Sequence, residues 1–343
     1  MKKIIGILTG GGDCPGLNPT IRAVVRKALL EKFSCIGIKN GWQGLIENDV
    51  MELNMDSVSG ILPRGGTILG TSRTNPFKEE KNVKKVLTNY KKLNLYCLVV
   101  VGGEDTLGVA NKLSEMGIKI VGIPKTIDND LSATDFTFGF DTAVNIATEA
   151  IDRLHTTAES HHRIMVVEVM GRHAGWIATY AGIAAGADVI LIPEKPIDLK
   201  EVCEILKKRK KRGKGFSIIV VAEGAKLKEE KLILKTEKKD AFGHVLLGGI
   251  GQALTDNIEK MTGFETRVTV LGHIQRGGTP TAFDRVLATR YGIKAVELVK
   301  AKKFGRMASL SGNDIISVPL SKAVGKLKTV DMKLYEIAKV FFG

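Results

Sequence analysis

The chain has 343 residues, of which 44% are hydrophobic, and its formal net charge is +14. Its length suits about two domains of roughly 100–200 residues each, and no stretch approaches the ~20 apolar residues of a membrane-spanning helix, so we expect no membrane partner. The charge leaves nucleic acids and small polyanionic substrates open as partners. The four cysteines show no metal-type spacing, and without an export signal they indicate a reducing, cytoplasmic location.

Short apolar runs alternate with helical patterns along most of the chain. The runs that predict strands are Lys3–Thr9, Cys97–Val101, Lys119–Ile123, Arg163–Val169, Asp188–Ile192, Phe216–Ala222 and Glu265–Leu271. The patterns that predict helices include Asn18–Lys32, Thr106–Met116, Asp141–Ser160, Arg172–Ala185, Leu199–Arg212 and Thr281–Lys302. Many strand segments are nearly continuous Val, Ile and Leu, which is typical of a parallel sheet buried on both faces. We therefore expect a doubly wound α/β fold, in which ligands bind beyond the carboxyl ends of the strands.

Two charged segments differ from this pattern. Residues 207–214 are the densest basic run, but they lack interleaved aromatic residues and lie where a helix should end. They therefore favour a solvated helix end over a nucleic-acid patch. Residues 226–245 are rich in Lys and Glu and predict an exposed excursion or hairpin without chemistry.

A glycine-rich loop, residues 10–18, follows the first predicted strand and opens a helix. Asn18 can cap that helix, with Pro19 at its first position. Glycines let the backbone approach an anion closely, and the helix start offers N–H groups and the positive end of its dipole. The loop suits a phosphate, but it has neither a Walker A nor a dinucleotide pattern, and an ordinary strand–helix turn would also explain it.

Two further loops that follow predicted strands carry pairs of carboxylates. Glu104 and Asp105 open one helix, where Mg²⁺ would reconcile them with a phosphate, although an acidic helix start explains them equally well. Asp128 and Asp130 lie in an irregular loop, where one can accept a hydroxyl proton and the other can position metal-bound phosphate. The alternative for that loop is an Asx-rich turn. Three such loops at three strand ends favour one shared site.

Longer motifs resemble the signatures of the phosphofructokinase family, in the family's order. They are Gly10–Asp13, Arg64–Thr67, Gly102–Thr106, Pro124–Asp130, Met170–Arg172, Glu223-Gly224 and Leu271–Gly278. The resemblance extends from Ile4 to about Arg306, which is nearly the whole chain. It implies two Rossmann-like three-layer α/β/α lobes with mostly parallel sheets. Residues 1–140 and 275–325 would form the phosphoryl-donor lobe, and residues 141–274 and 326–343 the sugar-phosphate lobe.

The resemblance also implies a reaction, which is phosphoryl transfer to the 1-hydroxyl of fructose 6-phosphate. Asp128 would be the general base, and Arg73 and Arg172 would stabilise the transferred group beside Thr126. Glu104 would bind Mg²⁺, although the family more often has Asp there. The donor would contact Gly11, Asp105, Thr106, Lys125 and Lys78. The sugar phosphate would contact Thr126, Ile127, Asp128, Asp130, Arg163, Met170, Gly171, Arg172, Glu223, Arg267, His273, Ile274, Gln275 and Arg276.

Two expectations about assembly and donor depend on single positions. Family members supply the arginines that match Arg163 and Arg267 from a neighbouring subunit, so the resemblance implies a homodimer or homotetramer. ATP-using members usually have glycine where this chain has Asp105 and Lys125. A carboxylate ~4 Å from an α-phosphate costs on the order of 4 kcal/mol at a dielectric of ~20, whereas a lysine suits the far phosphate of pyrophosphate. We therefore expect a reversible, pyrophosphate-dependent enzyme of glycolysis and gluconeogenesis.

Four alternatives remain at this point. One is a catalytically silent relative, against which the intact Asp128 and the phosphate-binding arginines argue. The enzyme could use ATP. An NAD or lipid kinase would share a glycine-rich loop, but it would leave Met170–Arg172 and Leu271–Gly278 unexplained. A basic nucleic-acid-binding protein would use the +14 charge, but the carboxylates of the loops would repel a phosphate backbone.

Overall fold

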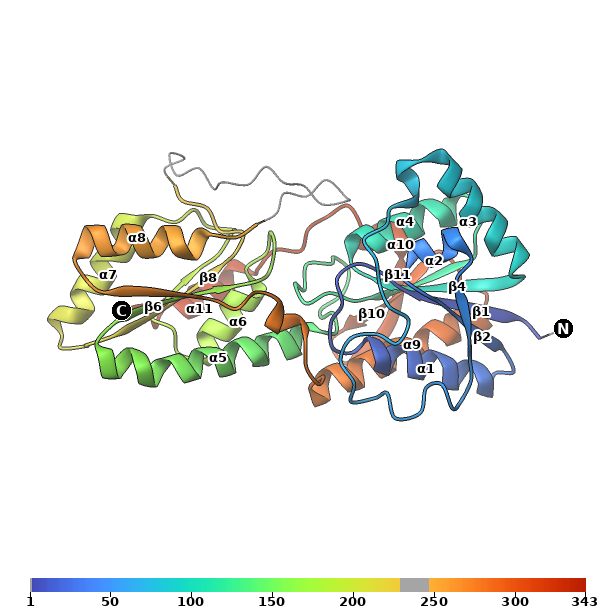
Figure 1. The fold of residues 1–343 in the computed structure, drawn as a ribbon, viewed down its shortest axis with the longest axis horizontal. Helices are drawn as coiled ribbons and strands as arrows, with labels where there is room; N and C mark the ends of the chain where they lie inside the picture. The colour runs from blue at the N-terminus through green and yellow to red at the C-terminus, as the bar shows by residue number, and fades with distance from the viewer. Residues whose placement is uncertain (1, 229–246) are drawn as a thin grey trace.

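The computed structural model describes residues 2–228 and 247–343, so most of the predicted excursion lies outside the described residues. Two β-sheets lie side by side with helices on both faces of each, and Figure 1 shows them as two lobes, which we call the seven-stranded and four-stranded lobes. Within these ranges, no helix is both long and apolar enough to cross a membrane. The cysteines, Cys14, Cys35, Cys97 and Cys203, are buried and free.

The seven-stranded lobe has the strand order β11-β10-β5-β4-β1-β2-β3. Its strands are β1 (Ile4–Thr9), β2 (Ser34–Ile38), β3 (Val50–Leu53), β4 (Leu95–Gly102), β5 (Ile120–Pro124), β10 (Arg306–Ser311) and β11 (Asp314–Pro319). The five inner strands run parallel, and the edge strands β3 and β11 pair antiparallel. Because β1, β4 and β5 are parallel, their carboxyl ends, each followed by a predicted loop, lie at the same end of the sheet.

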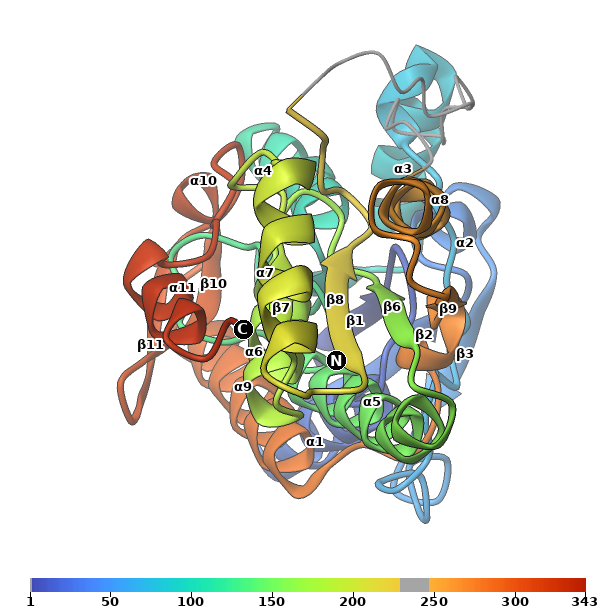
Figure 2. The same cartoon turned by 90° about the vertical axis from the view of Figure 1, so that its left-hand side faces the viewer.

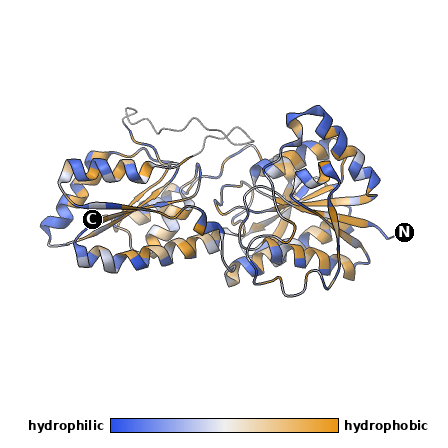
Figure 3. Ribbon diagram, in the orientation of Figure 1, coloured by the Kyte–Doolittle hydropathy of each residue, from blue (hydrophilic) through white to orange (hydrophobic). Residues whose placement is uncertain are grey.

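Helices cover both faces of this sheet (Figure 1). One face carries α1 (Leu17–Leu30) and α9 (Ala282–Lys300), and the other carries α2 (Trp42–Glu47), η1 (Pro76–Lys78), α3 (Glu80–Lys92), α4 (Glu104–Glu115) and α10 (Leu320–Ala323). Successive residues of β4 alternate between the two faces: Val99 packs in the cluster that contains α1 and α9, and Val100 in the cluster that contains α3 and α4. Figure 3 shows these strands as hydrophobic and the outer faces of the helices as hydrophilic.

The four-stranded lobe has the all-parallel order β7-β8-β6-β9. Its strands are β6 (Ile164–Val169), β7 (Val189–Leu191), β8 (Ser217–Ala222) and β9 (Thr266–Val270). One face carries α5 (Phe140–His161), α6 (Trp176–Ala184) and α11 (Met332–Lys339), and the other carries α7 (Leu199–Lys211) and α8 (Ile250–Thr262). The basic run covers the end of α7 and the exposed residues after it, which confirms the predicted helix end. Within this run, Arg209 pairs with Asp188 at 2.8 Å.

The chain passes between the lobes three times. It crosses at residues 125–139 between β5 and α5, at residues 271–281 through η2 (Gly272–Arg276), and at residues 324–331 between α10 and α11. Each lobe is therefore built from segments that are far apart in the sequence. The proposed domain boundaries at residues 140, 274 and 325 stay a prediction.

The prediction that Asn18 caps the first helix is wrong. The helix begins at Leu17, its cap is Gly16 in a left-handed conformation, and Asn18 is buried inside the first turn. The Asn18 side chain instead binds the loop after β3. It donates to the carbonyls of Arg64 and Gly65 at 3.1 and 3.2 Å and accepts from the Ile68 N–H at 2.8 Å.

Asn18→Ala should therefore destabilise the protein by about 2–3 kcal/mol, because three hydrogen bonds of a buried side chain are lost and their partners are left unsatisfied. The measurement is the urea midpoint at fixed protein concentration. Asn145→Ala is the control, because Asn145 is exposed on α5 and its side chain bonds only Glu149 in the described structure, at 3.4 Å. Equal midpoints for the two variants would contradict the assignment.

Candidate active site

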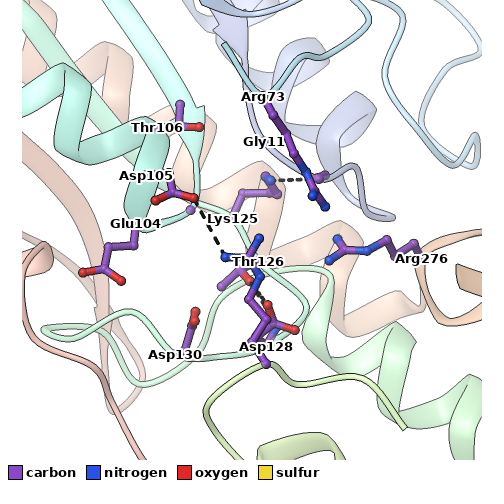
Figure 4. A pocket seen from close by; sticks show the side chains of 13 residues that line it. Gly11, Arg73, Glu104, Asp105, Thr106, Lys125, Thr126, Asp128, Asp130 and Arg276 are labelled. Carbon is purple, nitrogen blue, oxygen red and sulfur yellow. Dashed lines mark hydrogen bonds and ion pairs between the residues drawn. The ribbon is translucent and has the colours of Figure 1, made fainter. Parts of the chain in front are cut away.

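The loops after β1, β4 and β5 converge on one polar pocket, which a turn from the four-stranded lobe completes (Figure 4). Its lining residues are Gly11, Gly12, Arg73, Gly103, Glu104, Asp105, Thr106, Lys125, Thr126, Asp128, Asp130, Arg172 and Arg276. Eleven of the predicted site residues are thus brought together. Gly12 and Gly103 were not predicted individually, although both lie inside the motifs.

The first loop follows the end of β1 with its backbone in close contact with the pocket. Gly11 has φ +81°, and a Cβ at Gly12 would clash with a terminal nitrogen of Arg276. The N–H groups of Gly10 and Gly11 already bind the carbonyls of Val101 and Ser72, at 3.0 and 3.1 Å. Since those two amides are occupied, the cationic side chains around the loop are the stronger candidates for holding an anion.

Lys125 is the most buried of those cations, with 3% of its surface exposed. Its ammonium donates to the carbonyl of Gly12 (Figure 4). Burial lowers the pKa of Lys125, and the nearby Arg276 lowers it further. Arg276 donates to the Asp13 carbonyl at 3.2 Å, so two cations lie against the same glycine loop. A bound polyanion would relieve the repulsion between them.

Carboxylates occupy the other side of the pocket. Asp128 is 3% exposed, and its Oδ2 accepts from the Thr126 hydroxyl at 3.4 Å. Its Oδ1 is buried and has no hydrogen-bond partner in the described chain. Burial and the neighbouring Asp128 charge raise the pKa of Asp130 to about 7. An unpartnered, buried carboxylate oxygen is suited to accept a proton or to face a cation.

The carboxylates of the pocket fit a magnesium ion whose remaining ligands are phosphate oxygens and waters. No cluster of three or more His, Cys, Asp or Glu side chains suited to a metal occurs in the described part of the chain. Mg²⁺ commonly needs only one or two carboxylates, with phosphate oxygens and waters for the rest. Glu104 uses one oxygen to accept from the Gly325 N–H at 3.1 Å, so that oxygen is already occupied by the backbone.

Arg172 brings the four-stranded lobe into the pocket. Its φ is +51°, so the predicted helix 172–185 begins only at Trp176, after a turn. One terminal nitrogen of Arg172 lies 3.9 Å from Asp105 Oδ2 at the start of α4. This ion pair joins the two lobes across the pocket.

The turn that presents Arg172 is held by two predicted sugar-binding residues. Glu223 accepts from the Arg172 N–H at 3.2 Å, and burial raises the pKa of Glu223. Gln275 accepts from the Met170 N–H at 3.3 Å and donates to the Gly272 carbonyl at 3.1 Å. Gln275 is fully buried, so its described contacts are with protein.

The remaining predicted residues do not line the pocket, and their roles stay predictions. Ile127 is buried, whereas Lys78, His273 and Ile274 are exposed. Arg163 and Arg267 both pair with Glu265, at 2.8 and 2.6 Å. These three residues lie at the amino-terminal ends of β6 and β9, whereas Met170 follows the carboxyl end of β6. Within one chain, Arg163 and Arg267 therefore lie at the opposite edge of the sheet from the pocket.

Comparison with known proteins identifies the family of this chain. Residues 4–299 match the family model described as Phosphofructokinase. The chain belongs to the phosphofructokinase family. This membership confirms the family predicted from the motifs, in place of an NAD-kinase or lipid-kinase family.

Individual relatives carry both kinds of donor name. A Streptomyces coelicolor protein named pyrophosphate--fructose 6-phosphate 1-phosphotransferase is 58% identical over 341 residues, with 99% of each chain covered. A second protein from that organism, named ATP-dependent 6-phosphofructokinase 3, is 51% identical with 98% of each covered. The crystal structure of Pichia pastoris phosphofructokinase in the T-state matches with a TM-score of 0.85 at 33% identity, covering 94% of this chain and 35% of that one.

Proposed function

We propose that the protein is a pyrophosphate-dependent 6-phosphofructokinase. It transfers a phosphoryl group from pyrophosphate to the 1-hydroxyl of fructose 6-phosphate, giving fructose 1,6-bisphosphate and phosphate in a reversible step of glycolysis and gluconeogenesis. The relative at 58% identity supports this donor, and the relative at 51% identity makes ATP the alternative. A cytoplasmic homo-oligomer is part of the proposal.

The observation that carries the donor assignment is the placement of Asp105 and Lys125 in one pocket. Lys125 is buried against the glycine loop, where its charge can meet the far phosphate of pyrophosphate. Asp105 opens α4 and lines the same pocket, with its Oδ2 3.9 Å from a terminal nitrogen of Arg172. A carboxylate there repels an α-phosphate by on the order of 4 kcal/mol at ~4 Å, which is nearly three decades of affinity.

The mechanism follows from where the charges lie. Oxygen 1 of the sugar attacks a phosphorus of pyrophosphate, the bridging P–O bond breaks, and phosphate leaves. The hydroxyl proton passes to Asp128, whose unpartnered Oδ1 is the acceptor. Arg73 and Arg172 line the pocket and stabilise the charge on the transferred group. Magnesium, when bound through Glu104, would supply further charge neutralisation to pyrophosphate.

Two subunits together bind each fructose 6-phosphate. Glu223 and the Met170–Arg172 turn hold the sugar within one subunit. Arg163 and Arg267 bind the 6-phosphate of the sugar in the active site of a neighbouring subunit. This agrees with their position at the amino-terminal ends of β6 and β9, away from the pocket of their own chain.

The test is the initial rate with fructose 6-phosphate and Mg²⁺, comparing pyrophosphate with ATP. We expect kcat/KM for pyrophosphate to exceed that for ATP by at least about 100-fold. This is less than the roughly 1000-fold loss of ATP affinity that corresponds to the repulsion between Asp105 and an α-phosphate. The reverse reaction from fructose 1,6-bisphosphate and phosphate should yield pyrophosphate. A preference for ATP would overturn the donor assignment while leaving the family membership intact.

A further inference from the structure

The third crossing between the lobes contacts the loops that line the pocket. We call residues 325–330 the C-terminal strap. Figures 1 and 2 show the red end of the chain leaving α10 on the seven-stranded lobe and ending in α11 on the four-stranded lobe. These residues lie beyond the motifs that carry the family resemblance, so the sequence assigns them no role.

On the seven-stranded side, the strap binds two of the loops that line the pocket. The Gly325 N–H donates to Glu104 Oε1 at 3.1 Å. Leu327 bridges to Leu131 in antiparallel fashion, and the Lys328 N–H donates to the Asp130 carbonyl at 2.9 Å. The backbone of the strap therefore fixes the loop that carries Asp128 from its far end.

On the four-stranded side, the strap binds the start of α6, which follows the sugar-binding turn. The Lys328 carbonyl accepts from the Trp176 indole at 2.9 Å. The Val330 N–H donates to Glu194 at 2.9 Å, and the same carboxylate accepts from the Gly175 N–H at 3.0 Å. Gly175 is the cap residue of α6. One short segment thus contacts the Asp128 loop and the Arg172 turn at once.

The side chain of Lys328 adds a second set of bonds to the same loop. Its ammonium donates to the carbonyls of Thr134 and Asp135 and lies 5.1 Å from the centre of the Trp176 ring. The Asp135 carbonyl also accepts from Asn129 at 3.5 Å, and Asn129, with φ +50°, separates Asp128 from Asp130. Burial lowers the pKa of Lys328 to about 8, which reflects the packed position of this ammonium.

We propose that Lys328 is a positioning residue for phosphoryl transfer, holding the Asp128 loop in register with the Arg172 turn. The inference rests on the proposed function, which assigns Asp128 as the base and Arg172 to the transferred group. These groups belong to different lobes, and a misplacement of about 1 Å between reacting groups can reduce a rate ~100-fold. Lys328 touches neither substrate and acts through the loop.

Lys328→Met keeps the length of the side chain and removes the ammonium. We expect kcat to fall about 10- to 100-fold, while KM for both substrates stays within about threefold, because alignment is lost rather than binding. Lys328→Gln, which keeps one donor group, should lose about tenfold, and Lys328→Arg should restore kcat to within about threefold of wild type. Either of the first two variants decides the question if the other fails to fold.

Lys326→Met is the matched control. Lys326 lies on the same strap, is exposed and makes no side-chain hydrogen bond or ion pair within the described ranges, so its kcat should equal that of wild type. Folding is monitored by the urea midpoint, and rates are measured where each variant is fully folded.

The proposal is overturned if Lys328→Met or Lys328→Gln retains wild-type kcat, or if KM rises by the same factor as kcat falls. Asp128→Asn, measured in the same assay, tests the proposed base separately from the positioning role of Lys328. If Asp128→Asn is inactive and the Lys328 variants are normal, only the positioning role fails. If Asp128→Asn is fully active, the assignment of the base fails first.

Discussion

Asp128→Asn is expected to reduce turnover with pyrophosphate by about 10²- to 10⁴-fold, the range that a positioned general base contributes. The amide keeps the shape of the side chain but cannot accept the proton from the 1-hydroxyl. Because Thr126 and the loop backbone hold Asp128 in place, the amide should occupy the same position. KM for fructose 6-phosphate should therefore change by less than about threefold.

The control for this variant is Asp152→Asn, which removes the charge of an exposed carboxylate on α5. Its rate should match wild type. Steady-state rates in both directions give the comparison, since the base of the forward reaction is the acid of the reverse one. Near-normal turnover in the Asp128 variant would remove Asp128 as the base and leave its buried Oδ1 unexplained.

Asp105→Gly should shift the donor preference toward ATP. Removing the carboxylate opens space at the start of α4 and removes the repulsion of an α-phosphate, which corresponds to at most about three decades in affinity. It also removes the Arg172 ion pair, so kcat/KM for pyrophosphate should fall. We expect the ratio of kcat/KM for pyrophosphate to that for ATP to drop by about 10²- to 10³-fold.

Asp105→Asn separates charge from space in the same experiment. The amide removes the repulsion but keeps the volume, so it should shift the ratio less than glycine does. If glycine and asparagine have equal effects, charge alone decides the donor. If neither changes the ratio, the explanation based on Asp105 is wrong, and Lys125 is the next position to test.

The sequence predicts those buried strands that consist of continuous apolar residues, because their signal is local. β1, β4, β5, β6 and β8 are nearly continuous apolar runs, and each lies within one or two residues of its predicted bounds. Four strands of the seven-stranded sheet were not predicted. The inner strands β2 and β10 were missed because Ser, Gly or Arg interrupts their apolar residues, and the edge strands β3 and β11 because a partly exposed strand lacks such a run. Loop motifs likewise predicted the pocket, because glycines and carboxylates just after buried strands must meet at one edge of a parallel sheet.

What the sequence did not predict depends on contacts between distant segments. Asn18 has the composition of a cap, but its partners lie about 50 residues away, at Arg64 and Ile68. The left-handed turn at Arg172 delays α6 although its residues favour a helix. The bond from Gly325 to Glu104 joins positions 221 residues apart. No local pattern carries information of that kind.

The three crossings of the chain also bear on the order in which the protein can be completed during synthesis. The last 24 residues supply α10, the strap and α11, and α11 packs on the four-stranded lobe through Tyr335, whose hydroxyl donates to the Ile190 carbonyl at 2.9 Å. Neither lobe is complete until residues 320–339 have been translated. A nascent chain that ends before residue 325 therefore lacks the segment that joins the Asp128 loop to the start of α6, so we expect such a chain to form its aligned pocket only after this segment has been made.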